Sequence, residues 1–178
     1  MSAISPIKIA IVGPESTGKS SIAALLARHY NATYVEEQAR SYIDNLKRPY
    51  TLKDILAIAK SQVNAEEKFI AKRKALLFCD TTVLVTKIWA ENAFQICPPY
   101  IQQKWKEQDY ALHLLMDIDL PWEPDPQREH PHLRRFFFNW YESELKLAKA
   151  NYKIVSGVGN DRLASAIRLV DAFLQSQS

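Results

Sequence analysis

Cysteine is scarce in this sequence of 178 residues, which contains only Cys79 and Cys97. Two cysteines so widely spaced exclude a disulfide framework and a zinc motif, and a reducing cytoplasm is the simplest setting for such a chain. Long apolar runs are absent too, since none approaches the ~20 residues that a membrane-spanning helix needs. The first residues lead directly into an apolar strand pattern. We therefore expect a cytoplasmic protein with no signal peptide and no membrane association.

The sequence also lacks a strong excess of charge of one sign. Its formal net charge is +3 and its basic residues are scattered, so we expect no nucleic-acid partner. The basic tract at residues 72–74 is short and is typical of a solvated helix end. The length and an apolar fraction of 47% suit a single domain over residues 1–178, without repeats or a linker. The oligomeric state does not follow from the sequence.

Glycine is the third scarce residue, and its placement is informative. The glycines fall in two short loops, each between an apolar run and a helical pattern: Gly13 and Gly18 in the first, Gly157 and Gly159 in the second. Glycine permits positive φ angles and lets a ligand approach the backbone closely. We predict that both loops contact a nucleotide, the second through its two glycines and Asn160. The alternative for the second loop is a plain turn, in which Asn160 or Asp161 caps the next helix.

Strand patterns alternate with helical patterns along the whole chain. Short, near-continuously apolar runs predict strands at residues 8–12, 33–35, 75–79, 112–116 and 153–155. Apolar residues at helical spacing predict helices at residues 20–30, 38–46, 52–74, 83–94, 100–108, 133–150 and 161–174. Five strands separated by helices favour an α/β fold, with a five-stranded parallel sheet covered by helices on both faces.

Residues 13–20 read GPESTGKS, a complete match to the phosphate-binding motif G-x-x-x-x-G-K-[ST] between a strand and a helix. In such a P-loop the backbone N–H groups bind phosphate oxygens, the lysine contacts the β- and γ-phosphates, and the serine hydroxyl ligates Mg²⁺. We therefore expect ATP and Mg²⁺ as cofactors and Lys19 as a catalytic residue. The predicted ATP-binding residues of this loop are Gly13, Glu15, Ser16, Thr17, Gly18, Lys19, Ser20 and Ser21.

Acidic residues follow the second and third predicted strands, at the edge where open α/β sheets bind ligands. Asp80 is a candidate to hold Mg²⁺ together with Ser20, or to contact the substrate; alternatively it caps the next helix. Glu36 and Glu37 are candidates to bind substrate hydroxyls, and one of them to accept the proton of the attacking oxygen. Favourable charge at a helix start is their alternative role. Arg40 is expected either to pair with Glu36 or to contact a phosphate.

Residues 119–139 are predicted to form a lid, because they combine prolines, acids and Trp122 with several arginines. Arg128 and Arg135, with Arg134 beside it, are expected to neutralise the transferring phosphoryl group; solvated surface arginines are the alternative. Trp122 is expected to stack on a flat base or to pack in the core. The candidate substrate-binding residues of the whole chain are Glu36, Arg40, Asp80, Asp119, Trp122 and Asp125.

Four motifs in this order carry a family resemblance. They are GPESTGKS at residues 13–20, EEQAR at 36–40, DTTVLVTKIW at 80–89 and DLPW at 119–122. Together they resemble the ribosylnicotinamide kinase domain of the bacterial NadR proteins. The resemblance implies a P-loop kinase of the nucleoside-kinase type that transfers the γ-phosphoryl group of ATP to the 5′-hydroxyl of nicotinamide riboside, a step of NAD salvage. We expect no adenylyltransferase or DNA-binding domain before residue 1, and therefore do not expect those NadR activities.

Other P-loop classes lack their motifs here. A Ras-like switch needs D-x-x-G after the third strand and an N-K-x-D base motif, but Asp80 is followed by Thr-Thr-Val and N-K-x-D does not occur. An ABC-type ATPase needs a further glycine-rich signature, for which no glycine is left. The sequence therefore predicts a small-molecule kinase. The alternative is a non-catalytic or slowly hydrolysing ATP-binding regulator that senses pyridine nucleotides.

Overall fold

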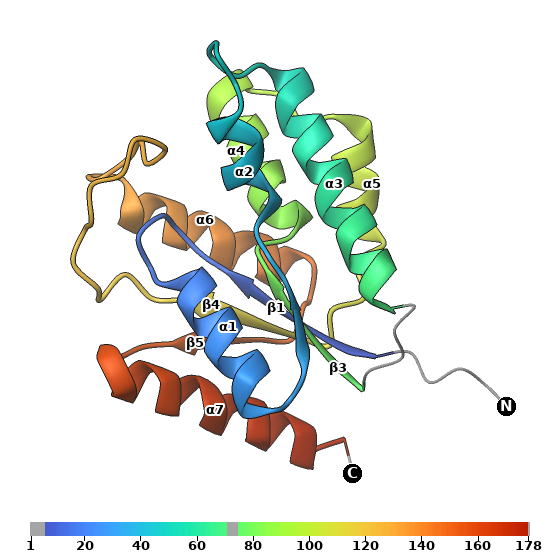
Figure 1. The fold of residues 1–178 in the computed structure, drawn as a ribbon, viewed down its shortest axis with the longest axis vertical. Coiled ribbons are helices and arrows are strands. Elements are labelled where there is room, and N and C mark those ends of the chain that lie inside the picture. Colours follow the sequence, from blue (N-terminus) through green and yellow to red (C-terminus); the bar gives the residue numbers. More distant parts are fainter. Residues whose placement is uncertain (1–5, 71–74, 178) are drawn as a thin grey trace, which may run out of the picture.

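Five parallel strands form one sheet at the centre of the computed structural model, which describes residues 6–70 and 75–177 (Figure 1). The strands are β1 (Ile7–Val12), β2 (Thr33–Val35), β3 (Leu76–Asp80), β4 (Leu112–Met116) and β5 (Tyr152–Val155). Their order across the sheet is β2-β3-β1-β4-β5. In the register of the central strands, Ile9 of β1 lies opposite Phe78 of β3 and Leu112 of β4. The predicted fold class is confirmed.

Helices cover both faces of this sheet because the central strands are apolar on both sides. On one face, α1 (Lys19–His29) and α7 (Gly159–Gln175) pack on the side chains that β1 and β4 direct towards them. On the other face, α4 (Val83–Phe94) and α6 (Arg134–Leu147) pack on the alternate residues of the same strands. Figure 1 shows α1 and α7 below the sheet and the other helices above it.

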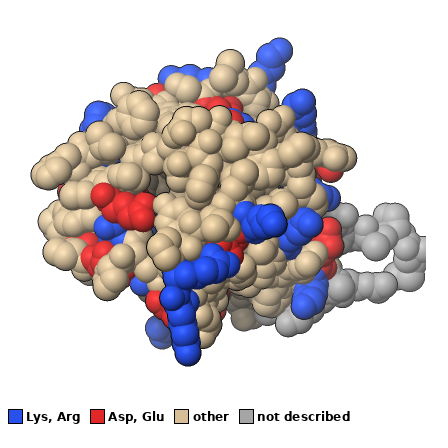
Figure 2. Space-filling view, turned by 90° about the horizontal axis from the view of Figure 1, so that it is seen from above, with Lys and Arg blue, Asp and Glu red and all other residues tan. Residues whose placement is uncertain are grey.

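Three further helices complete the upper layer: α2 (Gln38–Asp44), α3 (Leu52–Ile70) and α5 (Pro99–Lys106). The structure describes α3 as far as Ile70, so the predicted continuation to residue 74 and its basic tract lie outside the described residues. Among residues 6–70 and 75–177, no helix combines the length and the apolar character needed to cross a membrane. On the face viewed in Figure 2, acidic and basic side chains are interspersed among uncharged ones.

A histidine lies within the core of the central strand β4. The side chain of His113 is fully buried, with the rings of Trp105 and Tyr110 at centroid distances of 6.0 Å and 5.3 Å. Burial disfavours the charged imidazolium and lowers the pKa of His113 from 6.5 to about 4, although the backbone of Asn151 opposes the shift. The folded protein therefore keeps this imidazole neutral over a pH range in which the unfolded chain protonates it.

We predict that His113 makes the protein less stable in mild acid. Because the folded pKa is depressed, the stability is complete above the unfolded pKa of 6.5 and is lost as the pH falls towards the folded value of about 4. The loss reaches roughly 2 kcal/mol by about pH 5. Urea denaturation of wild-type and His113→Leu protein at about pH 7 and pH 5 measures it. The variant should lose less stability than the wild type over this range, and equal losses would contradict the prediction.

Candidate active site

The P-loop joins β1 to α1, and its two glycines have backbone angles that other residues rarely adopt. Gly13 has a φ of 141°, and a Cβ at this position would lie 3.0 Å from the carbonyl oxygen of Met116 in β4. Gly18, the residue before α1, has a φ of 76°. Close packing of the loop against β4 therefore requires Gly13. The loop's position at the start of α1 leaves the first backbone N–H groups of that helix available to an anion.

Lys19 lies inside this loop, where its ammonium group donates a hydrogen bond to the carbonyl oxygen of Pro14 at 2.7 Å. Burial lowers the pKa of Lys19, and the nearby charges of Glu37, Asp80 and Glu15 oppose that shift. The P-loop lysine therefore faces acids contributed by the ends of β2 and β3. The catalytic role of Lys19 stays a prediction, and these neighbours are the groups that would surround it.

Asp80, at the end of β3, is 2% exposed. Its Oδ1 atom has no hydrogen-bond partner among the residues that the structure describes. Burial raises the pKa of Asp80 to about 6, whereas the neighbouring Ser20 hydroxyl favours the charged form. The side chain that caps α4 is Thr82, which accepts from the backbone N–H of Leu84 at 3.3 Å. The alternative role of Asp80 as the helix cap is therefore wrong, and its carboxylate remains available.

The Ser20 and Asp80 side chains fit a magnesium ion that nucleotide phosphates and water would also ligate. Mg²⁺ prefers oxygen ligands and is usually held by only one or two protein carboxylates beside phosphates. An unpartnered, buried carboxylate oxygen next to a hydroxyl is such a donor set. Within the described part of the chain, no group of three or more His, Cys, Asp or Glu side chains could hold a metal by itself.

The two neighbouring glutamates after β2 have different surroundings. Glu36 is exposed, and its Oε1 atom accepts a hydrogen bond from the hydroxyl of Tyr34 at 3.1 Å. Glu37 precedes α2 and lines the same cavity as Lys19. The structure therefore brings Glu37, and not Glu36, to the site.

This cavity, with a volume of about 360 Å³, lies between the P-loop, the α2 segment, α4 and the lid. The rings of Tyr50 and Trp89 pack edge to face in its wall, with their centroids 4.9 Å apart. The remaining aromatic residues of the wall are Phe137 and Tyr141, and the polar ones include Gln62, Thr82, Thr86 and Asn92. Sequence reasoning missed this wall. One available signal was the helical spacing of Thr82, Thr86 and Trp89, which places them on one face of α4.

The predicted lid contacts the P-loop chiefly through Ser16. The Ser16 hydroxyl accepts hydrogen bonds from the backbone N–H of Glu123 at 2.9 Å and from Nη1 of Arg128 at 3.4 Å. The carboxylate of Glu15 accepts the backbone N–H groups of Glu129 at 3.1 Å and of His130 at 3.2 Å. Glu15 and Ser16, which were predicted to bind ATP, thus hold the lid over the loop.

Of the two catalytic candidates among the lid arginines, one reaches the site. The charge of Arg128 lies near Lys19 and lowers its pKa. The exposed side chain of Arg135 instead lies over the ring of Phe138, 5.2 Å from its centroid. The adjacent Arg134 donates to the carbonyl oxygen of Ser16 at 3.2 Å. The structure therefore places Arg134, and not Arg135, against the P-loop, because neighbouring residues of a helix point about 100° apart. The catalytic role of Arg135 stays a prediction.

Other lid and α2 candidates contact each other and do not line the cavity wall. Arg40 forms an ion pair with Asp125 at 3.0 Å, so its predicted pairing with Glu36 is wrong. Trp122 is half-buried, with the guanidinium carbon of Arg134 5.9 Å from its ring centroid, so it does not pack in the core. On the same side, the hydroxyl of Tyr50 donates to Glu129 at 3.0 Å. These contacts join the lid to the α2 side of the cavity.

The second glycine loop lies beside the P-loop, at the same edge of the sheet. Gly157 and Gly159 have φ angles of 106° and 53°. The following helix, α7, already begins at Gly159 with Val158 as the residue before it, and no side chain caps it. The alternative in which Asn160 or Asp161 is the cap is therefore wrong. Asn160 is exposed at the helix start.

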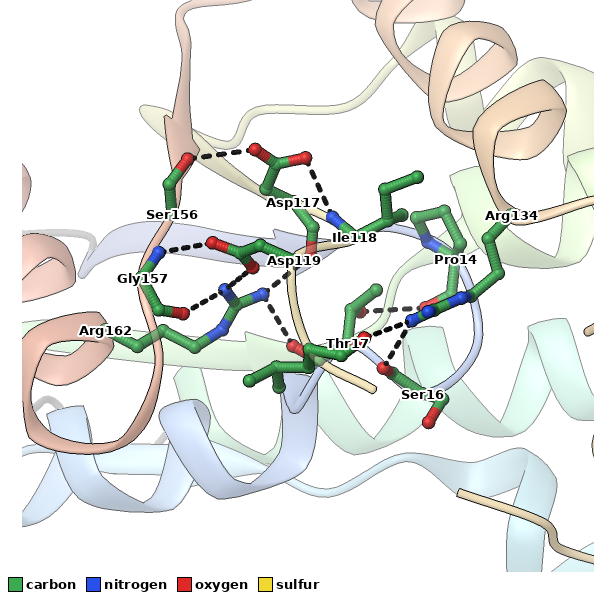
Figure 3. A network of polar contacts seen from close by, with 11 residues as sticks. Pro14, Ser16, Thr17, Asp117, Ile118, Asp119, Arg134, Ser156, Gly157 and Arg162 are labelled. Carbon is green, nitrogen blue, oxygen red and sulfur yellow. Dashed lines mark hydrogen bonds and ion pairs between the residues drawn. The ribbon is translucent and has the colours of Figure 1, made fainter. Parts of the chain in front are cut away.

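Arg162 is the residue of this edge that sequence reasoning did not identify. It is buried and donates to the carbonyl oxygens of Thr17 at 2.9 Å and Gly157 at 2.9 Å (Figure 3). It also pairs with Asp119, and Asp119 accepts the backbone N–H of Gly157. Asp119, predicted to bind substrate, is thus a partner of the second glycine loop and does not line the cavity. A single arginine in an amphipathic helix gives no sequence signal of burial.

Comparisons with known proteins agree with this geometry. A family model described as an AAA domain, AAA_28, matches residues 8–162. The trifunctional NAD biosynthesis/regulator protein NadR of Salmonella typhimurium is 28% identical over 127 residues, which are 67% of this chain and 30% of that protein. The chain thus spans less than a third of the length of this curated relative.

Solved structures share the fold. A NadR structure in complex with NR has a TM-score of 0.80 and 21% identity, covering 96% of this chain and 52% of that one. Thymidylate kinase from Ehrlichia chaffeensis has a TM-score of 0.63 and 14% identity, covering 94% of this chain and 98% of that one. The resemblance to the P-loop domain of NadR is confirmed, and the fold is that of nucleoside and nucleotide kinases. The chain belongs to the AAA_28 family of AAA domains, as a NadR-like P-loop domain.

Proposed function

We propose that this chain is a single kinase domain that transfers the γ-phosphoryl group of ATP to the 5′-hydroxyl of nicotinamide riboside. The observation that carries the proposal is the cavity of about 360 Å³ that opens beside Lys19 and Glu37, under the lid. A kinase needs room for a second substrate beside the γ-phosphate of ATP, whereas a slowly hydrolysing regulator needs room only for water. A cavity of this size next to the P-loop therefore supports the kinase. The NadR structures, one with NAD and AMP-PNP and one with NR, support this choice of donor and acceptor.

The donor phosphates would lie on the backbone N–H groups of the P-loop. Lys19 would place its positive charge on the β- and γ-phosphates, and Arg128 of the lid would supply a second positive charge nearby. Neither cation forms or breaks a covalent bond. Their role is to stabilise the negative charge of the transferring group in a site that the lid shields from water.

Ser20 and Asp80 would hold the magnesium ion. When bound, Mg²⁺ neutralises charge on the β- and γ-phosphates of the donor. The raised pKa of Asp80, about 6, still leaves its carboxylate charged at neutral pH. The position of Asp80 beside Lys19 and Ser20 would orient the phosphate chain towards the cavity.

The acceptor would occupy the aromatic part of the cavity. Its volume falls in the range of small-molecule sites, and the rings of Tyr50 and Trp89 in its wall offer faces and edges to a flat base. The base of nicotinamide riboside is a cation, which aromatic faces and nearby carboxylates favour. Glu37 and Glu129 supply such carboxylates in the same wall. Glu37, the nearer of the two to Lys19, would accept the proton of the 5′-hydroxyl.

The direct test measures transfer of labelled γ-phosphate from ATP to a panel of nucleosides. We expect multiple turnovers with nicotinamide riboside and a requirement for Mg²⁺. Turnover with a different nucleoside would correct the acceptor and keep the kinase. Binding of ATP without transfer to any nucleoside would contradict the proposal and favour the regulator.

Lys19→Ala tests the phosphate site. Removal of a cation that stabilises the transition state should lower the transfer rate roughly 10²-fold or more, because several kcal/mol of stabilisation are lost. Circular dichroism should show an unchanged fold, since within the described residues the one hydrogen bond of this side chain goes to Pro14 of its own loop. A folded variant with the wild-type rate would place the reaction elsewhere.

Asp80→Asn tests the magnesium site and predicts opposite effects on stability and ligand binding. The pKa of this acid is raised by folding from 3.8 to about 6, so stability falls as the pH rises through that interval and stays low above it. A neutral amide should therefore stabilise the free protein at about pH 8 by roughly 1 to 3 kcal/mol. It should also remove most of the thermal stabilisation by ATP with Mg²⁺. Thermal melts with and without the ligands measure both effects, and an unchanged response to Mg²⁺ would exclude the metal role.

Glu37→Gln, with Glu36→Gln as its matched control, tests the proton acceptor. A positioned general base contributes ~10²- to 10⁴-fold to a rate, so the Glu37 variant should lose kcat by about that factor while it still binds ATP. The Glu36 variant should retain nearly the wild-type kcat, because its carboxylate faces Tyr34 outside the cavity. Steady-state kinetics of both variants measure the two kcat values. The reverse pattern, or wild-type kcat in both, would rule out Glu37 as the base.

A further inference from the structure

Arg162 is a buried cation for which the proposed chemistry has no use. Its side chain is 3% exposed, and its guanidinium group reaches three loops at the carboxyl edge of the sheet (Figure 3). Nη2 donates to the carbonyl oxygen of Thr17 in the P-loop at 2.9 Å, and to that of Asp117 after β4 at 2.8 Å. Nη1 donates to the carbonyl oxygen of Gly157 at 2.9 Å and to the carboxylate of Asp119, where the lid begins. One side chain therefore joins the P-loop, the lid start and the second glycine loop.

Both glycine loops pack closely around this residue. A Cβ on Gly18 would lie 3.2 Å from Cδ1 of Leu120 and 3.9 Å from Nε of Arg162. A Cβ on Gly157 would lie 3.2 Å from the backbone nitrogen of Arg162. Side chains at these positions would press on Arg162 or on the lid start. The glycines therefore serve the fit of the loops to each other, in addition to any approach of a ligand.

The surroundings of Arg162 do not suggest that its main role is to stabilise the fold. Burial of a guanidinium group is costly, and within residues 6–70 and 75–177 Asp119 is the one acid that forms an ion pair with it. Nε has no hydrogen-bond partner among the residues that the structure describes. Well-packed apolar side chains of the same volume usually stabilise a protein at least as well as a buried ion pair. The planar guanidinium group, unlike an apolar side chain, holds the groups that accept its hydrogen bonds in a fixed geometry relative to each other.

We propose that Arg162 is a positioning residue for ATP, which holds the P-loop, the lid start and the second glycine loop at the mutual distance that one nucleotide spans. The inference rests on the part of the proposed function that places ATP on the P-loop. Arg162 does not contact the phosphates. It would act through the backbone of Thr17, next to the phosphate site, and through the backbone of Gly157. Gly157 belongs to the second glycine loop, on which this proposal places the base of ATP.

Arg162→Lys tests this role, because lysine keeps the charge but its single ammonium group cannot reach all four acceptors. The test compares titration calorimetry of ATP with Mg²⁺ and of inorganic tripolyphosphate with Mg²⁺, which has phosphates but no base. The variant should bind ATP at least roughly tenfold more weakly, because it loses charge-assisted hydrogen bonds that align the second glycine loop with the P-loop. Its affinity for tripolyphosphate should change less than about threefold. The control is Arg168→Lys, on the exposed side of the same helix, which should leave both affinities unchanged.

The ratio of the two affinities separates positioning from a structural role. A parallel loss of both affinities, or no change of either in folded Arg162→Lys protein, would overturn the inference. Should that variant fail to fold, Asp119→Asn removes the charge partner and keeps its shape, and it should show the same selective loss of ATP affinity. An unchanged ratio in Asp119→Asn would then overturn the inference. Wild-type protein that bound neither ligand would instead contradict the proposed function on which it rests.

Discussion

Parallel pairing brings the carboxyl ends of all five strands to one edge of the sheet, and every part of the candidate site depends on this constraint. At this edge lie, in chain order, the P-loop after β1, Glu37 after β2, Asp80 at the end of β3, the lid after β4 and the second glycine loop after β5. Parallel strands need helical crossovers on both faces, and these cover the sheet. Parallel pairing is thus the reason that the charged groups gather at one edge, and the apolar character of the central strands is the reason that helices cover both faces.

The features that the sequence predicted well are local ones. The P-loop motif fixes its own geometry, because two glycines, a lysine and a hydroxyl at set spacing have a meaning independent of the rest of the chain. The helix at residues 83–94 has both predicted ends, since Thr82 supplies a capping oxygen at its start. Lys19, Glu37 and Asp80 could be placed near each other because each lies in the segment between a predicted parallel strand and the next helix, or at its border. Sequence order and parallel topology were enough for that.

The features that it could not predict depend on the rotation of helices and on contacts between distant segments. The preference of the P-loop for Arg134 over Arg135 depends on how α6 is rotated about its axis. The aromatic wall combines Tyr50 from a loop with Trp89 of α4 and Phe137 of α6. These residues come together through tertiary packing, which no local sequence pattern predicts. For the same reason the partners of Arg40 and Asp119 could not be inferred from neighbours in the sequence.

The lid has contacts on both sides of the cavity, and this has a kinetic consequence. Glu15 and Ser16 hold it on the P-loop side, while Arg40 and Tyr50 hold it on the side of α2. In the proposed reaction, movement of the lid would therefore uncover the donor phosphates and the acceptor pocket together. Donor and acceptor would then share one gate, and such a gate often limits the turnover of enzymes that close over their substrates. Where its opening is the slowest step, acceptors of different reactivity turn over at the same rate.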